Sequence, residues 1–152
     1  MLYPYLKWLH VLSAIVAVGA NATYGIWLSR ASRDPDHLSF TLRSIKILDD
    51  RVANPAYGLL LLTGLSMVLT VSFPLTTSWL LTALALYVAL VLVGVLGYTP
   101  ALRNQIRILE EEGFDSSRYQ AQARSGIVLG IVLAALAISI VFLMVVKPAL
   151  WG

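Results

Sequence analysis

Long apolar stretches alternate with short polar ones along this 152-residue chain. No charged residue occurs between Arg51 and Arg103, and none occurs from Ser125 to Val146. One crossing of a bilayer core needs about 20 apolar residues, so these stretches have room for three helices, and the apolar run near the N-terminus makes a fourth. The pattern predicts an all-α, integral-membrane four-helix bundle, one domain over residues 1–152, with spans at about 5–28, 53–73, 78–98 and 126–147.

An amphipathic segment precedes the second predicted span. Asp34 and Pro35 are typical of a helix start, as the N-cap and the first helical residue. Apolar residues then recur at helical spacing, at Leu38, Leu42, Ile45, Leu48 and Val52. Charged residues occupy the other side, at Arg43, Lys46 and Arg51. We expect a surface helix at about 35–52 that lies on the membrane and leads straight into the second span.

The lysine and arginine content of each connection indicates its side of the membrane. Residues 29–52 hold five of these cations and residues 99–124 hold four, whereas the opposite side holds only Lys7 and Lys147. This asymmetry predicts a multi-pass protein of the bacterial plasma membrane with both termini on the outer, non-cytoplasmic side. We expect Trp27, Tyr57 and Tyr98 in the aromatic belt of the inner interface.

Composition narrows the function classes. Hydrophobic residues make up 59% of the chain and charged residues 12%, well below the roughly 25% of a soluble domain. The net charge of +3 comes mostly from the connections, so it indicates contact with lipid headgroups and not with nucleic acid. The chain has no cysteine, which excludes disulfides, iron–sulfur clusters and covalently attached c-type haem.

The first apolar run has the outline of a cleavable signal sequence, with Lys7 near its start. However, Trp8, His10 and Ser13 interrupt what would be its apolar region. We therefore interpret this run as the first membrane span.

One face of the first predicted span is small or polar. Helical steps from His10 reach Ala14, Ala17, Asn21 and Tyr24. The flanking residues are large and aliphatic, as lipid-facing residues are, so the small face should turn toward the other helices. Uncharged polar residues within the spans are expected mostly to form hydrogen bonds between helices; they are Asn21, Thr63, Ser66 and Thr82. His10, the one histidine within a span, is the main candidate for a functional residue.

His10 is a candidate ligand for haem iron. It lies about 7 Å from the outer end of its helix at 1.5 Å per residue. Met67 of the second span and Met144 of the fourth reach a similar depth, and histidine with methionine, or histidine alone, can hold the iron of a b-type haem. Lys7 and Lys147 are placed to pair with the haem propionates.

A simpler interpretation of the same residues stays open. A histidine near an interface often hydrogen-bonds a neighbouring helix, and methionines fill helix interfaces without binding a ligand. Lys7 and Lys147 would then be ordinary interfacial anchors. His37 lies in a polar connection beside acidic residues and is expected to be solvated.

Small residues recur every four positions in two spans. They are Ala17, Asn21 and Gly25 in the first span, and Gly126, Gly130 and Ala134 in the fourth. Such stripes allow helices to approach closely, either inside the bundle or across a homodimer. No series of charged residues crosses the spans, which disfavours a proton pump or an ion-coupled carrier.

Several short motifs resemble a known family. They are YLKWLHVLS at residues 5–13, Asn54-Pro55 with Thr63-Gly64, Trp79-Leu80, and VVKP at residues 145–148. In this order they are similar to HemJ-type protoporphyrinogen oxidase, and more closely to its relatives in the integral-membrane family called domain of unknown function 2269. The resemblance implies four membrane helices, haem b bound through His10, and oxidation of protoporphyrinogen IX.

The chain departs from the HemJ pattern at the start of the third span. HemJ-type proteins carry a histidine and a lysine important for activity where Leu81 and Ala83 stand here. The favoured function is therefore a membrane haem b protein with an electron-transfer or redox role, in contact with a quinone or redox partner. Whether the chain is an enzyme stays open. The alternative is a non-catalytic membrane subunit or small-molecule carrier scaffold without a cofactor.

Overall fold

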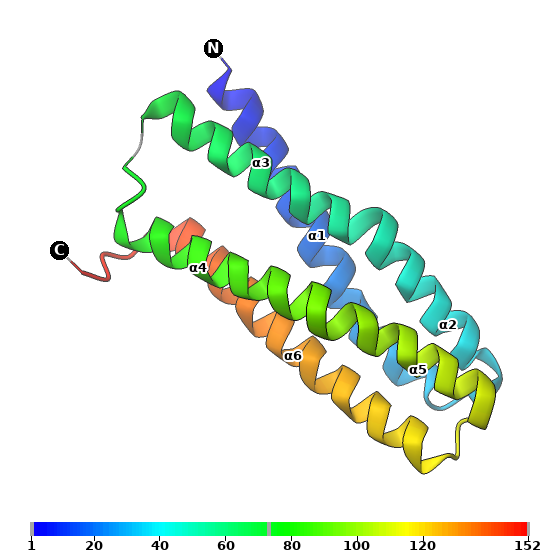
Figure 1. Cartoon of the computed structure of the whole chain (residues 1–152). Helices are drawn as coiled ribbons and strands as arrows, with labels where there is room; N and C mark the ends of the chain where they lie inside the picture. Colours follow the sequence, from blue (N-terminus) through cyan, green and yellow to red (C-terminus); the bar gives the residue numbers. More distant parts are fainter. Residues whose placement is uncertain (1, 73, 152) are drawn as a thin grey trace.

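A computed structural model describes residues 2–72 and 74–151. All the regular structure in these ranges is helical (Figure 1). The α-helices are α1 (Tyr3–Ala31), α2 (Pro35–Leu48), α3 (Asn54–Val71), α4 (Ser78–Leu92), α5 (Thr99–Glu112) and α6 (Ser117–Val146). Two π-helical turns, η1 (Asp49–Ala53) and η2 (Val93–Tyr98), join α2 to α3 and α4 to α5. Phe73, the predicted end of the second span, lies outside the described residues.

The four predicted spans are confirmed. By length and composition, four continuous helices of the described chain are able to cross a membrane: Tyr3–Ala31, Pro35–Val71, Ser78–Glu112 and Ser117–Val146. Large apolar side chains cover their outer surfaces, with Leu69, Leu96 and Val145 each more than 70% exposed. Such a surface is solvated by lipid, because water would leave it a strong aggregation site.

The helices form two pairs. Helix α1 packs along α3, and α4 packs along α6. Within the described residues, no Cα of α3 lies within 8 Å of a Cα of α4. The pairs meet through α1 with α6 and α2 with α5. Apolar side chains of α1 and α3 also pack against Tyr87, Leu90, Ala137 and Ile140 of α4 and α6, and the Tyr87 hydroxyl donates to the Tyr57 carbonyl at 2.8 Å.

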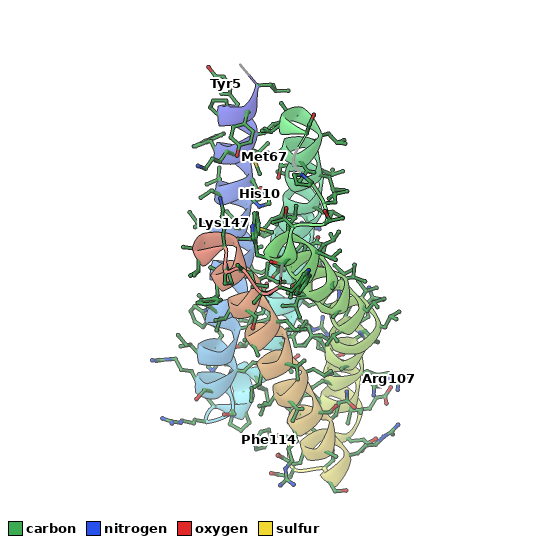
Figure 2. All side chains as sticks on the ribbon, turned by 90° about the vertical axis from the view of Figure 1, so that its left-hand side faces the viewer. Tyr5, His10, Met67, Arg107, Phe114 and Lys147 are labelled. Carbon is green, nitrogen blue, oxygen red and sulfur yellow. The ribbon has the colours of Figure 1, made fainter. Side chains whose placement is uncertain are left out.

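Both termini lie at one end of the bundle, and α2 and α5 lie at the other (Figure 1). We call these the terminal end and the loop end. His10, Met67 and Lys147 lie toward the terminal end, whereas Arg107 and Phe114 lie toward the loop end (Figure 2). The gap between the helix pairs therefore has two halves with different neighbours.

Helix α2 is amphipathic, as predicted, but protein rather than lipid covers its apolar face. Leu38, Leu42 and Ile45 are at most 1% exposed and belong to a core with residues of α1, α5 and α6. The helix also continues the line of α3 and does not turn across the end of the bundle (Figure 1). The expected position on the membrane surface is therefore wrong, because α1 and α5 extend far enough to bury this face.

Both π-helical turns are followed by a proline. Pro55 lies at the start of α3, and Pro100 lies at the start of α5. A proline in a helix interior has no N–H and its ring pushes away the carbonyl one turn earlier. A wider turn accommodates this without breaking the helix. The helix therefore continues through Pro100, from Ser78 to Glu112.

Candidate functional site

His10 on α1 is hydrogen-bonded to α3 through one ring nitrogen. Its Nδ1 lies 3.0 Å from the Leu60 carbonyl oxygen and 3.1 Å from the Thr63 hydroxyl oxygen. The carbonyl can only accept, and the Thr63 hydroxyl donates its proton to backbone carbonyls of its own helix. Nδ1 must therefore carry the proton, and the lone pair of the neutral ring is on Nε2.

Gly64 has no side chain and so leaves room for the His10 imidazole against α3. A Cβ at this position would lie 3.1 Å from His10 Cε1, closer than nearly all real Cβ contacts. The ring therefore rests on a helix surface that any side chain would occupy. This gives the Thr63-Gly64 pair a structural role: Thr63 accepts from the ring and Gly64 leaves room for it.

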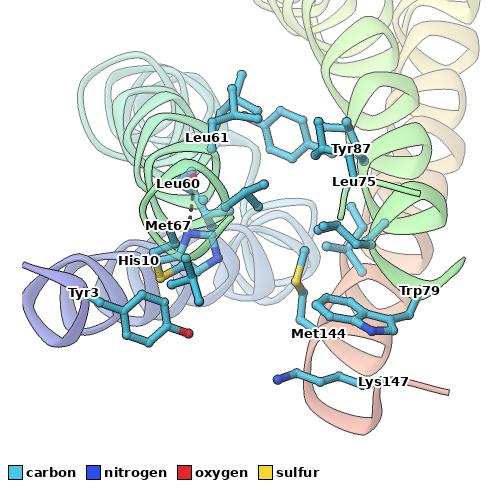
Figure 3. Close-up of a pocket in the computed structure, with 18 residues that line it drawn as sticks. Tyr3, His10, Leu60, Leu61, Met67, Leu75, Trp79, Tyr87, Met144 and Lys147 are labelled. Carbon is cyan, nitrogen blue, oxygen red and sulfur yellow. Dashed lines mark hydrogen bonds between the residues drawn. The ribbon is translucent and has the colours of Figure 1, made fainter. Parts of the chain in front are cut away.

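His10 borders a cavity between the two helix pairs, which we call the His10 cavity. Its volume is about 180 Å³. Met67 lies beside His10, and Met144, Trp79 and Lys147 lie across the cavity (Figure 3). The remaining lining is mostly aliphatic, so the polar groups are few and gathered at the terminal end.

The structure brings most of the predicted site residues together. Met67, Met144 and Lys147 line the same cavity as His10. The Lys147 ammonium lies 5.4 Å from the ring centroid of Trp79, in a cation–π contact. Lys7 is exposed and is not among the residues of the described chain that line the cavity.

The two positions that depart from the HemJ pattern differ in environment. Ala83 is 1% exposed and lines the His10 cavity. Leu81 is 47% exposed on the outer surface. Only the first of these positions therefore changes the chemistry of the cavity, by leaving an apolar methyl group at its wall.

A second and larger cavity occupies the loop-end half of the gap, and we call it the Asp49 cavity. Its volume is about 1290 Å³. Five tyrosines line it, namely Tyr24, Tyr57, Tyr87, Tyr98 and Tyr119. Asp49 is the one charged residue of its described lining. Sequence reasoning missed this cavity, because its polar residues come from four separate segments.

Several predictions about polar residues of the spans are resolved by contacts. Asn21 donates to the Tyr57 hydroxyl at 2.8 Å, which confirms the expected interhelical bond, and Thr63 bonds His10 across helices. Ser66 and Thr82 instead donate to backbone carbonyls of their own helices, so the expectation is wrong for these two.

Tyr57 and Tyr98 line the Asp49 cavity, and Tyr98 is 8% exposed. Their expected place in an aromatic belt at the inner interface is therefore wrong. Of the three residues predicted for this belt, only Trp27 is largely exposed.

The small-residue stripes face the bundle interior. Asn21 and Gly25 of α1 and the three small residues of α6 all line the Asp49 cavity. A Cβ on Gly126 would lie 3.2 Å from the Gln105 side-chain oxygen, so this glycine allows α5 to approach. Gly126 is therefore packed within one copy of the chain, whereas Gly25 and Ala134 are exposed.

Within the described residues, no three histidine, aspartate or glutamate side chains gather where they could hold a bare metal ion. The His10 cavity offers one oriented imidazole and two thioethers instead.

Fold and surface together define a polytopic membrane protein with four apolar helices. The chain belongs to the family described as a predicted integral membrane protein, DUF2269, whose family model matches residues 4–148. No curated protein and no solved structure matches the chain.

Proposed function

We propose that this chain is a haem b-binding membrane protein with an electron-transfer or redox role, and that Nε2 of His10 is a ligand of the iron. The observation that carries the proposal is the bond from His10 Nδ1–H to the Leu60 carbonyl. Metal-binding histidines almost always donate their other ring N–H to a carbonyl or carboxylate, which fixes the tautomer and makes the free nitrogen more basic.

The donor chemistry of the cavity fits a haem. Met67 and Met144 are thioethers that can occupy the second axial position, and Lys147 is placed to pair with a propionate. Lys7, one turn before His10, would reach a propionate only from outside the present cavity. When bound, the haem would supply a one-electron couple; the protein would supply the ligand, the apolar surroundings and the compensating charge.

The room in the cavity sets a condition on this proposal. A cavity of about 150 Å³ holds one benzene ring, and the His10 cavity measures about 180 Å³, so it holds much less than a porphyrin. Haem binding therefore requires the helix pairs to move apart at the terminal end. On the side of α3 and α4, no Cα atoms of the two helices lie within 8 Å within the described residues, but the apolar contacts of α1 and α3 with α4 and α6 would have to be lost.

The setting of the proposed site follows from the cation asymmetry. With both termini outside the bacterial plasma membrane, His10 would lie in the outer leaflet. Its redox partner would then be a quinone in the membrane or a protein at the outer surface. A homodimer would have to use surfaces other than Gly126, which packs against Gln105 within one copy of the chain.

The test is an absorption spectrum of the protein purified in mild detergent from haem-replete cells, with and without dithionite. A Soret band that changes on reduction is expected, either as purified or after hemin addition. His10→Ala should abolish it. His37→Ala is the matched control, because His37 is exposed and bonds only Asp34, and it should leave the spectrum unchanged.

A second candidate function has one observation in its favour. The methyl group of Ala83 at the wall of the His10 cavity replaces a group that the HemJ resemblance associates with activity. A non-catalytic subunit or carrier scaffold would tolerate an apolar residue at this position without losing its function. It predicts a colourless protein that does not bind hemin, and stable co-purification with another membrane protein.

A further inference from the structure

The Asp49 carboxylate is buried with little to compensate its charge. Asp49 is 6% exposed, and the one hydrogen bond to its carboxylate comes from the Asn54 amide at 3.3 Å. Among the described residues, no lysine, arginine or histidine forms an ion pair with it. The nearby Lys46 pairs with Asp50 instead. A carboxylate has about four positions that can accept a hydrogen bond, so most of the acceptor positions of Asp49 are left for a ligand in the cavity.

The Tyr24 hydroxyl is the second unsatisfied group at this place. Tyr24 is 5% exposed, and its hydroxyl oxygen is buried without a hydrogen-bond partner. Tyr24 lines the same cavity as Asp49. Buried hydroxyls without a partner are rare in folded proteins and need an explanation such as a bound molecule.

The backbone also singles out this level of the bundle. Asp49 belongs to the π-helical turn η1, and Tyr98 belongs to η2. Both residues line the Asp49 cavity. Single π-helical turns inside α-helices occur frequently at functional sites, where the extra residue redirects side chains.

The chemistry of the lining selects the ligand. An uncompensated carboxylate attracts a cation that can donate hydrogen bonds, and a tyrosine hydroxyl can accept from the same group. Tyrosine rings stabilise a cation over their faces. The rest of the lining is mostly aliphatic or small, with further polar side chains that include Asn21, Asn54 and Gln105. The volume of about 1290 Å³ exceeds that of most small-molecule sites, which span about 300–1,000 Å³.

We propose that the Asp49 cavity binds an amphipathic amine in its protonated form. The ammonium group donates to the Asp49 carboxylate and the Tyr24 hydroxyl, and the apolar body lies among the aliphatic side chains of the gap. An anion is excluded by the carboxylate, and a neutral alcohol leaves the carboxylate without a counter-charge. This site is independent of haem binding at His10.

The test compares three probes that share one apolar ring system. Naphthylmethylamine is protonated at neutral pH, naphthylmethanol is neutral and naphthoate is anionic. Binding to the full chain in phosphatidylcholine nanodiscs is measured by calorimetry, with protein-free nanodiscs subtracted. The amine is expected to bind about tenfold more tightly than the alcohol, the gain of a charge-assisted hydrogen bond, and the anion is expected not to bind.

Two neighbouring acids provide a matched pair of variants. Asp49→Asn should abolish the preference for the amine over the alcohol. Asp50→Asn removes an exposed carboxylate that already pairs with Lys46, and it should keep the preference. Equal binding of amine and alcohol to the unchanged protein, or a preference that survives Asp49→Asn, would overturn the proposal.

Tyr24→Phe keeps the test decisive if Asp49→Asn does not fold. This change deletes only the hydroxyl that has no partner in the bundle, so the fold should tolerate it. Amine affinity should fall severalfold, and alcohol affinity should change less. An unchanged amine affinity in Tyr24→Phe would contradict the assigned geometry.

Discussion

The polar groups in the two halves of the gap between the helix pairs differ in how fully they are hydrogen-bonded. At the terminal end, α3 satisfies the Nδ1 proton of His10 twice over and leaves one lone pair, on Nε2. At the loop end, the Asp49 carboxylate has one donor and the Tyr24 hydroxyl has no partner. Leu61, Leu84 and Tyr87 border both cavities, so the halves meet at the Tyr87–Tyr57 bond.

This difference teaches what each half is suited to bind. An imidazole held in one tautomer is a preorganised electron-pair donor, which suits a metal centre and needs no charge on the ligand. A carboxylate and a hydroxyl that lack partners are suited to a ligand that brings its own donors and positive charge. The two sites should therefore respond independently to substitution, and the following changes test that independence.

The largest effect is expected from a change in the apolar core of the loop end, at Leu42, which lines neither cavity. Leu42 is fully buried in the core that joins α2 to the rest of the loop end. Leu42→Ala should lower the free energy of unfolding by about 2–5 kcal/mol, the usual cost of a large-to-small change in a packed core. Thermal unfolding in detergent measures it. Leu69→Ala, at a 79% exposed position, should change stability far less, and equal losses would contradict the assigned core.

A change at Gly64 should affect the His10 cavity alone. In Gly64→Val the new side chain occupies the space of the imidazole, since even a Cβ would lie 3.1 Å from His10 Cε1. Hemin affinity should fall by about tenfold or more, because the ring is forced from its rotamer and loses its bond to Leu60. Hemin titration measures this. Gly58→Ala, which meets no atom within 4 Å, is the control and should leave hemin affinity unchanged.

Removing the hydrogen bond between Tyr87 and Tyr57 should have a smaller effect on hemin affinity, and this effect should be an increase. Tyr87→Phe deletes the 2.8 Å hydrogen bond to Tyr57, which contributes about 0.5–1.5 kcal/mol to stability. The helix pairs then separate more easily, so hemin affinity should rise severalfold while the thermal midpoint falls slightly. A fall in hemin affinity would show that the terminal end does not open in this way.

The smallest effect separates the two lysines. Lys147 lines the His10 cavity and Lys7 does not. Lys147→Gln should lower hemin affinity about two- to fivefold, the size of one partly exposed charge contact. Lys7→Gln should change hemin affinity less than this. A larger loss of hemin affinity in Lys7→Gln than in Lys147→Gln, in the same titration, would indicate that the propionates lie beside Lys7 on α1.

The sequence was sufficient for the spans and for much of the His10 cavity. Apolar runs of the right length predict membrane helices directly. Counting depth along those helices correctly grouped His10, Met67 and Met144, because helical rise is constant. The hydrogen bond of Asn21 was also predictable, since an amide in a span has few other partners than a neighbouring helix.

The Asp49 cavity could not be predicted in the same way. Asp49 and Asp50 are adjacent and look equivalent in sequence, yet one is buried and the other pairs with Lys46. Both residues lie in the π-helical turn η1, which changes the helical register that periodicity rules assume to be constant. The amphipathic pattern of α2 likewise predicted an apolar face, but it contains no information on whether lipid or protein covers that face.

The central claim is that His10 presents a free Nε2 to a haem. The most direct measurement is a hemin titration of the unchanged protein and of His10→Ala, followed by reduced-minus-oxidised spectra of both. The account predicts a saturable Soret band with a reduction-dependent shift in the unchanged protein and neither feature in His10→Ala. A protein that stays colourless, or equal spectra for the two proteins, would contradict it.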